Sequence, residues 1–162
     1  MHLIQKLLCF FFLIFFFSSC SNKAIDFNNN LVNIQKKVLK EAQAFGKKMK
    51  EVKADSLPLT NAKKDANKLT TFIDIEINQA ENLSAPKDGN NLKSAILDQL
   101  QFEKDIVFKI GRLTEGGISQ EERTKIGMEF LNSGYKANQL EDKVRLAQEA
   151  FAKQNKFKLE TK

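Results

Sequence analysis

Apolar side chains recur every three or four positions along most of this chain, which is the spacing of an amphipathic α-helix. Four stretches share the pattern: residues 27–52, 59–80, 92–113 and 126–151. In the first of them the apolar face carries Phe27, Leu31, Ile34, Val38, Ala42, Phe45, Met49 and Val52. No stretch alternates apolar and polar residues in the way that predicts a half-buried strand. The pattern therefore predicts four long helices, each with one face to bury.

Residues that break helices lie between these stretches. The breaks fall at residues 56–58, 85–89 and 116–117, which hold both prolines of the chain and a glycine pair. Ser119 and Glu122 then form a capping box that opens the fourth stretch. Short connections between long amphipathic helices favour antiparallel neighbours. We therefore predict an all-α fold, an antiparallel up-down-up-down four-helix bundle over residues 27–155, followed by a frayed C-terminal tail over residues 156–162.

The chain opens with a different pattern, a short cationic start followed by the unbroken apolar run Leu7–Phe17. A helix over that run is about 16 Å long, well short of the ~30 Å hydrocarbon core of a bilayer, so it fits the apolar part of a secretion signal. The next residues, Phe17-Ser18-Ser19-Cys20, resemble the lipobox of bacterial lipoproteins. The resemblance implies a signal peptide over residues 1–19, cleavage before Cys20, and acyl chains such as palmitate that anchor Cys20 to a membrane.

The alternative is an uncleaved membrane anchor in which Cys20 is a free thiol. Cys9 leaves with the predicted signal peptide, so Cys20 has no disulfide partner in the mature chain, which supports lipid attachment. We predict that residues 20–26 are the lipidated cysteine and a short polar tether. Ser21 stands where some lipoproteins carry a sorting aspartate, and it favours the outer membrane of a Gram-negative bacterium. Periplasmic and surface-exposed display both stay open.

Candidate catalytic residues are sparse. The single histidine, His2, lies in the predicted signal peptide, so the mature chain lacks the Glu-x-x-His pairs of a di-iron bundle and the Ser-His or Cys-His pairs of a nucleophilic enzyme. Removing residues 1–19, with Lys6 as their one charge, lowers the formal net charge from +6 to +5. That excess is too small and dispersed to predict nucleic-acid binding. We therefore predict a protein that is not an enzyme and binds no cofactor, metal or nucleic acid.

One polar residue interrupts the predicted apolar face of the third helix. Glu103 falls on that face, and counting from the turns places Thr70, Ser133 and Ala42 at the same height. One interpretation is a polar core layer, in which Thr70 and Ser133 hold the Glu103 carboxylate in a cavity with water or a ligand. The other is that Glu103 reaches water at the edge of its helix.

Tyr135 lies opposite the apolar face of the fourth helix, with Gly127 and Gly134 on the flank of that face. A tyrosine there either packs along a neighbouring side chain or serves as an anchor for a protein partner. The glycines each cost about 1 kcal/mol of helix propensity relative to alanine. Either they admit a neighbouring helix closely, or they open a groove for a ligand or peptide.

Two segments, FNNNLVNIQKKVLKEAQAF (residues 27–45) and LAQEAFAKQNKFKLE (residues 146–160), resemble a family of uncharacterised four-helix surface lipoproteins of spirochaetes and Bacteroidota. The resemblance implies an envelope lipoprotein with a helical bundle, and it supplies no activity. We therefore expect a lipid-anchored cell-envelope protein with a non-catalytic interaction or structural role at the membrane surface, held there by the lipid on Cys20 and contacting an unknown envelope protein. The alternative is a carrier that binds a small or lipid-like ligand between its helices.

Overall fold

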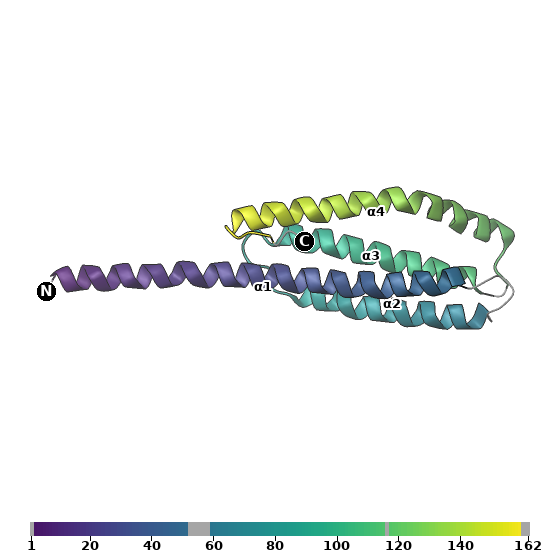
Figure 1. The fold of residues 1–162 in the computed structure, drawn as a ribbon, viewed down its shortest axis with the longest axis horizontal. Helices are drawn as coiled ribbons and strands as arrows, with labels where there is room; N and C mark the ends of the chain where they lie inside the picture. The colour runs from purple at the N-terminus through teal and green to yellow at the C-terminus, as the bar shows by residue number, and fades with distance from the viewer. Residues whose placement is uncertain (1, 52–58, 116, 160–162) are drawn as a thin grey trace.

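Four helices make up the described part of the protein (Figure 1). The computed structural model describes residues 2–51, 59–115 and 117–159. The helices are α1 (His2–Glu51), α2 (Leu59–Asn82), α3 (Asn90–Leu113) and α4 (Gln120–Gln154), and the described ranges contain no strand. The predicted break at residues 56–58, Val52, Gly116 and residues 160–162 of the predicted tail lie outside these ranges.

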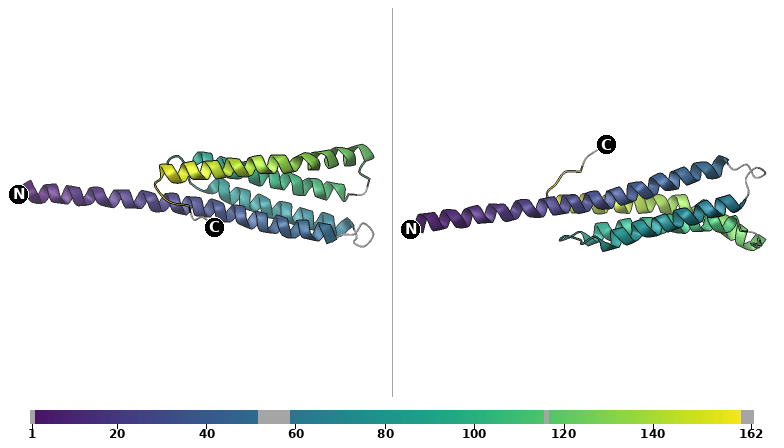
Figure 2. Two further views of the ribbon diagram at one scale, coloured as in Figure 1. Left: turned by 45° about the horizontal axis from the view of Figure 1, so that its top comes forward. Right: turned by 90° about the horizontal axis from the view of Figure 1, so that it is seen from below.

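Consecutive helices run in opposite directions and form one elongated bundle (Figure 2). Between α1 and α2, Lys37 pairs with Glu76 and Lys48 pairs with Asp65, so residue numbers rise on one helix as they fall on the other. The most extensive packing joins α2 to α3 and α3 to α4. The predicted all-α, antiparallel four-helix bundle is confirmed.

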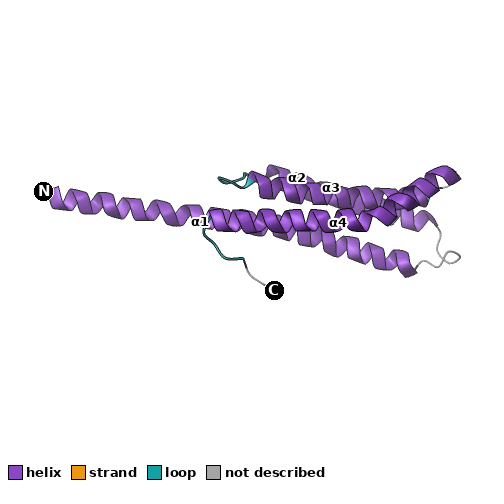
Figure 3. Cartoon of the chain, turned by 90° about the horizontal axis from the view of Figure 1, so that it is seen from above, coloured by secondary structure: helices purple, strands orange, loops and turns teal. Residues whose placement is uncertain are grey.

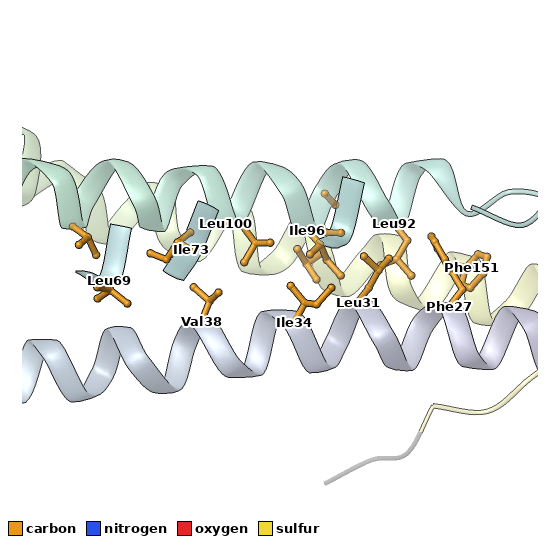
Figure 4. Packing of buried hydrophobic residues seen from close by; sticks show 14 of the residues in the cluster. Phe27, Leu31, Ile34, Val38, Leu69, Ile73, Leu92, Ile96, Leu100 and Phe151 are labelled. Atoms are coloured by element: carbon orange, nitrogen blue, oxygen red, sulfur yellow. The ribbon is translucent and has the colours of Figure 1, made fainter. Parts of the chain in front are cut away.

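The apolar faces of the four helices meet in one core (Figure 4). Every helix contributes to its largest fully buried side chains, which are Leu31, Val38, Ile73, Leu92, Ile96, Leu100 and Phe151. Burying each such side chain contributes about 1.5–3 kcal/mol. Helices approach most closely where side chains are small, and a Cβ added at Gly111 of α3 would lie 3.1 Å from the Cβ of Ala66 on α2. The three-and-four spacing of the sequence thus supplies the core.

Helix α1 joins the core earlier along the chain than the sequence analysis predicts. Residues 20–26 are helical, and Ala24 is fully buried in the core. The predicted polar tether is therefore not separate from the bundle: residues 20–26 belong to α1, and the apolar spacing of that helix continues back from Leu31 through Phe27 to Ala24. Alanine is a weak apolar signal, so the turn of α1 around Ala24, which comes before Phe27, is easily missed in the sequence. The N-terminal part of α1 projects beyond the other three helices (Figure 1).

The C-terminal segment folds back onto the core after α4 ends. Lys156 is left-handed, with φ 57°, and the Phe157 N–H donates to the Ala152 carbonyl at 3.1 Å, as in a Schellman motif. The Phe157 ring lies 5.9 Å from the ring of Phe151, which lies 5.7 Å from the ring of Phe27. The predicted frayed tail is therefore wrong for its first two residues, since three phenylalanines close this end of the bundle.

The turn between α3 and α4 is held by side chains from both helices. The Ser119 side-chain oxygen accepts the Glu122 N–H at 3.1 Å, which is the serine half of the predicted capping box and caps α4. The Glu122 carboxylate binds Arg112 of α3 at 2.8 Å, a contact that joins the start of α4 to α3. Helix α4 curves towards this end of the bundle (Figure 3).

Candidate functional site

Three exposed apolar side chains lie on the side of α4 that faces away from the core. Met128, Leu131 and Tyr135, spaced by three and four positions, are 62%, 85% and 73% exposed, and we call them the α4 outer face. The neighbouring Glu129 is turned towards α3, where it accepts from Lys109 at 2.7 Å. The three residues of the α4 outer face are themselves uncharged. Most of the Tyr135 side chain is exposed to solvent and does not pack within the bundle.

The glycines beside this face are not explained by close helix packing. A Cβ added at Gly127 or Gly134 would meet no atom within 4 Å. The first interpretation from the sequence, a neighbouring helix of this chain at both glycines, is therefore wrong. Ser133, next to Gly134, donates its hydroxyl to the Phe130 carbonyl at 2.7 Å, and serine–glycine pairs of this kind are sites where helices bend.

Glu103 is half-buried on α3, and burial raises the pKa of its carboxyl above the ordinary value. The two hydroxyls predicted to hold it bind elsewhere. Thr70 donates to the Ala66 carbonyl at 2.9 Å, and Ser133 donates to the Phe130 carbonyl at 2.7 Å. Because each hydroxyl has one proton to donate, neither donates to Glu103 in this conformation.

Contacts between helices also set the heights of these residues. Lys104, the residue after Glu103, pairs with Asp74 of α2 at 2.6 Å. Thr70 lies four residues before Asp74, about 6 Å along the axis of α2 and so slightly more than one turn away. The ring of Phe102, the residue before Glu103, lies 5.3 Å from the Lys136 ammonium of α4. This contact places Ser133 within about one turn of the height of Glu103. Thr70 thus lies slightly more than one turn from the height of Glu103 and Ser133 lies about one turn or less from it, and a ligand at this layer stays a prediction.

A second carboxylate, Glu76 of α2, is buried more deeply than Glu103. Its side chain is 4% exposed, and it accepts from the Lys37 ammonium of α1 at 3.3 and 3.4 Å. A carboxylate removed from water in this way needs a counter-charge, which Lys37 supplies. The sequence carries a signal for it, because Glu76 continues the three-and-four spacing from Ile73 to Ala80. A search for apolar residues alone does not detect Glu76, because its side chain is charged.

Carboxamide side chains connect α1 to the other two helices. Gln35 donates to Gln99 of α3 at 2.6 Å, and Gln148 of α4 donates to the buried Asn28 at 3.1 Å. With the ion pair to Glu76, α1 has a polar side-chain contact with each of the other three helices. Buried polar contacts of this kind can specify the register of one helix against another.

Three grooves on the described surface are lined mainly by polar side chains. The largest, of about 700 Å³, lies between α1 and α2 and is lined by Asn30, Asn33, Ile34, Lys37, Ile75, Asn78, Gln79, Asn82 and Leu83. A groove of about 560 Å³ between α1 and α4 includes Gln35 and Gln148 in its walls. A third, of about 460 Å³, follows the lysine-rich outer side of α2. None of these three is an apolar cavity between helices.

The described residues include no group of three or more histidine, cysteine or carboxylate side chains placed to hold a metal ion. Within the same ranges, no helix has an apolar stretch long enough to cross a bilayer. Compared with known proteins, the chain matches no family model, and no curated protein or solved structure is significantly similar to it. Functional inference therefore depends on the geometry of this bundle.

Proposed function

We propose that this protein is anchored in the bacterial cell envelope by lipid on Cys20, in the outer membrane of a Gram-negative cell, and binds another envelope protein without catalysing a reaction. The exposed α4 outer face carries the interaction part of the proposal. Apolar side chains exposed together on a helix are typical of surfaces that bind a partner, and tyrosine is a frequent anchor in such contacts.

The position of Cys20 supports the anchoring. It lies one helical turn before Ala24, which is fully buried, so acyl chains on Cys20 would hold this end of the bundle within about 6 Å of the lipid. Phe151 packs on Phe27 near the same end. Tyr135 lies 16 residues before Phe151 on α4, so it would stand about 24 Å farther from the membrane. The bundle would then act as a spacer that presents the α4 outer face to a partner.

The carrier function is less well supported by the described grooves. A small lipid-like ligand needs an enclosed apolar cavity between the helices, whereas the three grooves are open to solvent and most of their lining residues are polar. The core is instead filled by large side chains from all four helices. An interaction role is the function that this geometry favours.

Changing Cys20 to serine tests the anchoring. We expect Cys20→Ser to abolish palmitate incorporation and to move the protein from the detergent phase to the aqueous phase on detergent partition. Cys9→Ser is the matched control, because it removes a cysteine from the predicted signal peptide and should leave both measurements unchanged. If Cys20→Ser stays membrane-bound with residues 1–19 attached, the chain is held by an uncleaved anchor and the lipid proposal is wrong.

Photo-crosslinking in native cells tests the interaction. A crosslinking residue in place of Tyr135 should capture a discrete envelope protein, and the same residue at the exposed Lys64 of α2 should not. Equal capture from both positions, or none from Tyr135, would count against the α4 outer face as a contact surface.

A further inference from the structure

We propose that the groove between α1 and α2 binds an extended, uncharged polypeptide segment, whose main chain is held by carboxamide side chains. This inference deepens the interaction role proposed above, because it names the chemistry of one partner segment. It rests on the residues of the groove and not on the α4 outer face, so the two surfaces can be tested separately.

The walls of the groove are rich in carboxamides. Of its nine lining residues, five carry this group, and we call the site the amide groove: Asn30 and Asn33 on α1, and Asn78, Gln79 and Asn82 on α2. All five are exposed, so their carboxamides face solvent and not the core. The bundle does not need five amides there for packing, since apolar side chains fill its core.

The two walls face each other along the groove. Counting from the Lys37–Glu76 pair along antiparallel helices, Asn33 lies opposite Ala80 and beside Gln79, and Asn30 lies opposite Leu83 and beside Asn82. Asn30 and Lys37 are about 10 Å apart along α1. An extended chain advances about 3.4 Å per residue, so this length accommodates about three residues of a partner segment.

Carboxamides match the main chain of an extended peptide. Each has an NH₂ group that donates and an oxygen that accepts, and the main chain presents N–H and C=O groups alternately. Apolar side chains contribute the floor of the groove, where Ile34 is buried and Ile75 is 50% exposed. In an extended segment alternate side chains would point to this floor, which suits aliphatic residues. The nine lining residues include no aromatic ring to stack on a sugar, so the composition favours a peptide over a glycan.

The charge of the groove favours an uncharged segment. Lys37 is its one charged lining residue, and its ammonium is already paired with Glu76 beneath it. A charged partner side chain would lose water in this groove without gaining an unpaired counter-charge. The same ion pair joins α1 to α2 at one end of the groove and holds the two walls together.

Binding to synthetic peptides tests the proposal. The probe is an immobilised array of short peptides with blocked ends, built from glycine, alanine, valine, leucine, serine and threonine, and the protein purified from membranes is applied in detergent micelles. We expect a subset to bind, and methylation of main-chain nitrogens in those peptides to weaken binding by about tenfold or more, since it removes the donors that carboxamides recognise.

Variants of the amide groove assign the binding to this site. Asn33→Ala with Asn78→Ala should weaken binding of the selected peptides by about tenfold or more. The matched control is Asn132→Ala with Gln139→Ala, which removes two exposed carboxamides from α4 and should leave binding unchanged. All four positions are exposed, so both double variants should keep the thermal stability of the wild type, measured in the same micelles.

Three results would overturn the proposal: no peptide bound by the wild type, equal binding by the groove variant, or insensitivity to main-chain methylation. Binding of N-acetylglucosamine oligomers that the groove variant loses would assign the groove to a glycan and also overturn it. A partner crosslinked from Tyr135 in cells, together with any of these results, would leave the interaction role standing while the amide groove fails.

Discussion

Removing the Lys37 ammonium should destabilise the bundle much more than removing its carboxylate partner. The two side chains of this ion pair differ in exposure, at 54% for Lys37 and 4% for Glu76. If Glu76 is replaced by leucine, the lysine can turn to water and the core gains an apolar side chain. If Lys37 is replaced by methionine, the carboxylate stays buried without a counter-charge.

The expected magnitudes follow from this asymmetry. Breaking a buried ion pair by removing one partner costs about 3–5 kcal/mol, and the exposure of Lys37 reduces that figure. We expect Lys37→Met to lower the free energy of unfolding by about 2–3 kcal/mol, or the Tm by about 6–10 °C. Glu76→Leu should leave the free energy of unfolding unchanged or raise it by about 1 kcal/mol, and the double variant should be close to the wild type.

Thermal and chemical unfolding followed by circular dichroism measure these differences. The control is Lys143→Met, because Lys143 is also 54% exposed while its partner Asp98, at 2.6 Å, is 47% exposed. Breaking that surface pair should cost about 0.5 kcal/mol or less. Equal losses in Lys37→Met and Lys143→Met would show that burial of the partner does not set the cost. A larger loss in Glu76→Leu than in Lys37→Met would refute the reasoning outright.

Two further predictions use the same unfolding measurements. Glu103→Gln and Glu103→Leu should raise the Tm at neutral pH, because burial raises the pKa of the folded carboxyl above its ordinary value of 4.5 and its ionisation then opposes folding. That penalty disappears as the pH falls through the raised pKa towards 4.5, so the gain of the glutamine variant should shrink on acidification, and a gain that grows would contradict the assignment. Gly134→Ala should raise the free energy of unfolding by about 0.5–1 kcal/mol, since no atom lies within 4 Å of the added Cβ. Gly111→Ala should gain less or lose, because its Cβ would lie 3.1 Å from that of Ala66, and equal gains at the two glycines would be the contrary result.

The helices were predictable because their signal is repeated many times along the chain. Leu31, Val38 and Phe45 lie on one face by spacing alone, and all three are buried. The two ends of the buried core, at Ala24 and at Phe157, were harder to predict, since each depends on one weak signal. Ala24 is small, and Phe157 reaches the core only because Lys156 adopts a left-handed conformation that no pattern of apolar residues reveals.

Candidate sites were less predictable, because they depend on how one helix is set against another. The angle of Tyr135 around α4 follows from the sequence, and its exposure agrees with it. The height of Thr70 against Glu103 depends on loop lengths and helix ends, and a few residues of error move a side chain by a full turn. The amide groove needs two helices in a known register, which contacts such as Lys37–Glu76 define and a single sequence does not.

The polar contacts of α1 have a mechanical consequence. In a lipid-anchored bundle, a pulling force on the partner side would be transmitted to the membrane through Cys20, along the axis of α1. Sliding α1 out of the bundle would load its contacts with α2, α3 and α4 in shear, all at once, and not one after another as in peeling. Glu76, Gln99 and Gln148, each held by a side chain of α1, would resist that sliding together. If Cys20 carries the lipid, α1 would thus pass tension to all three other helices through these polar contacts.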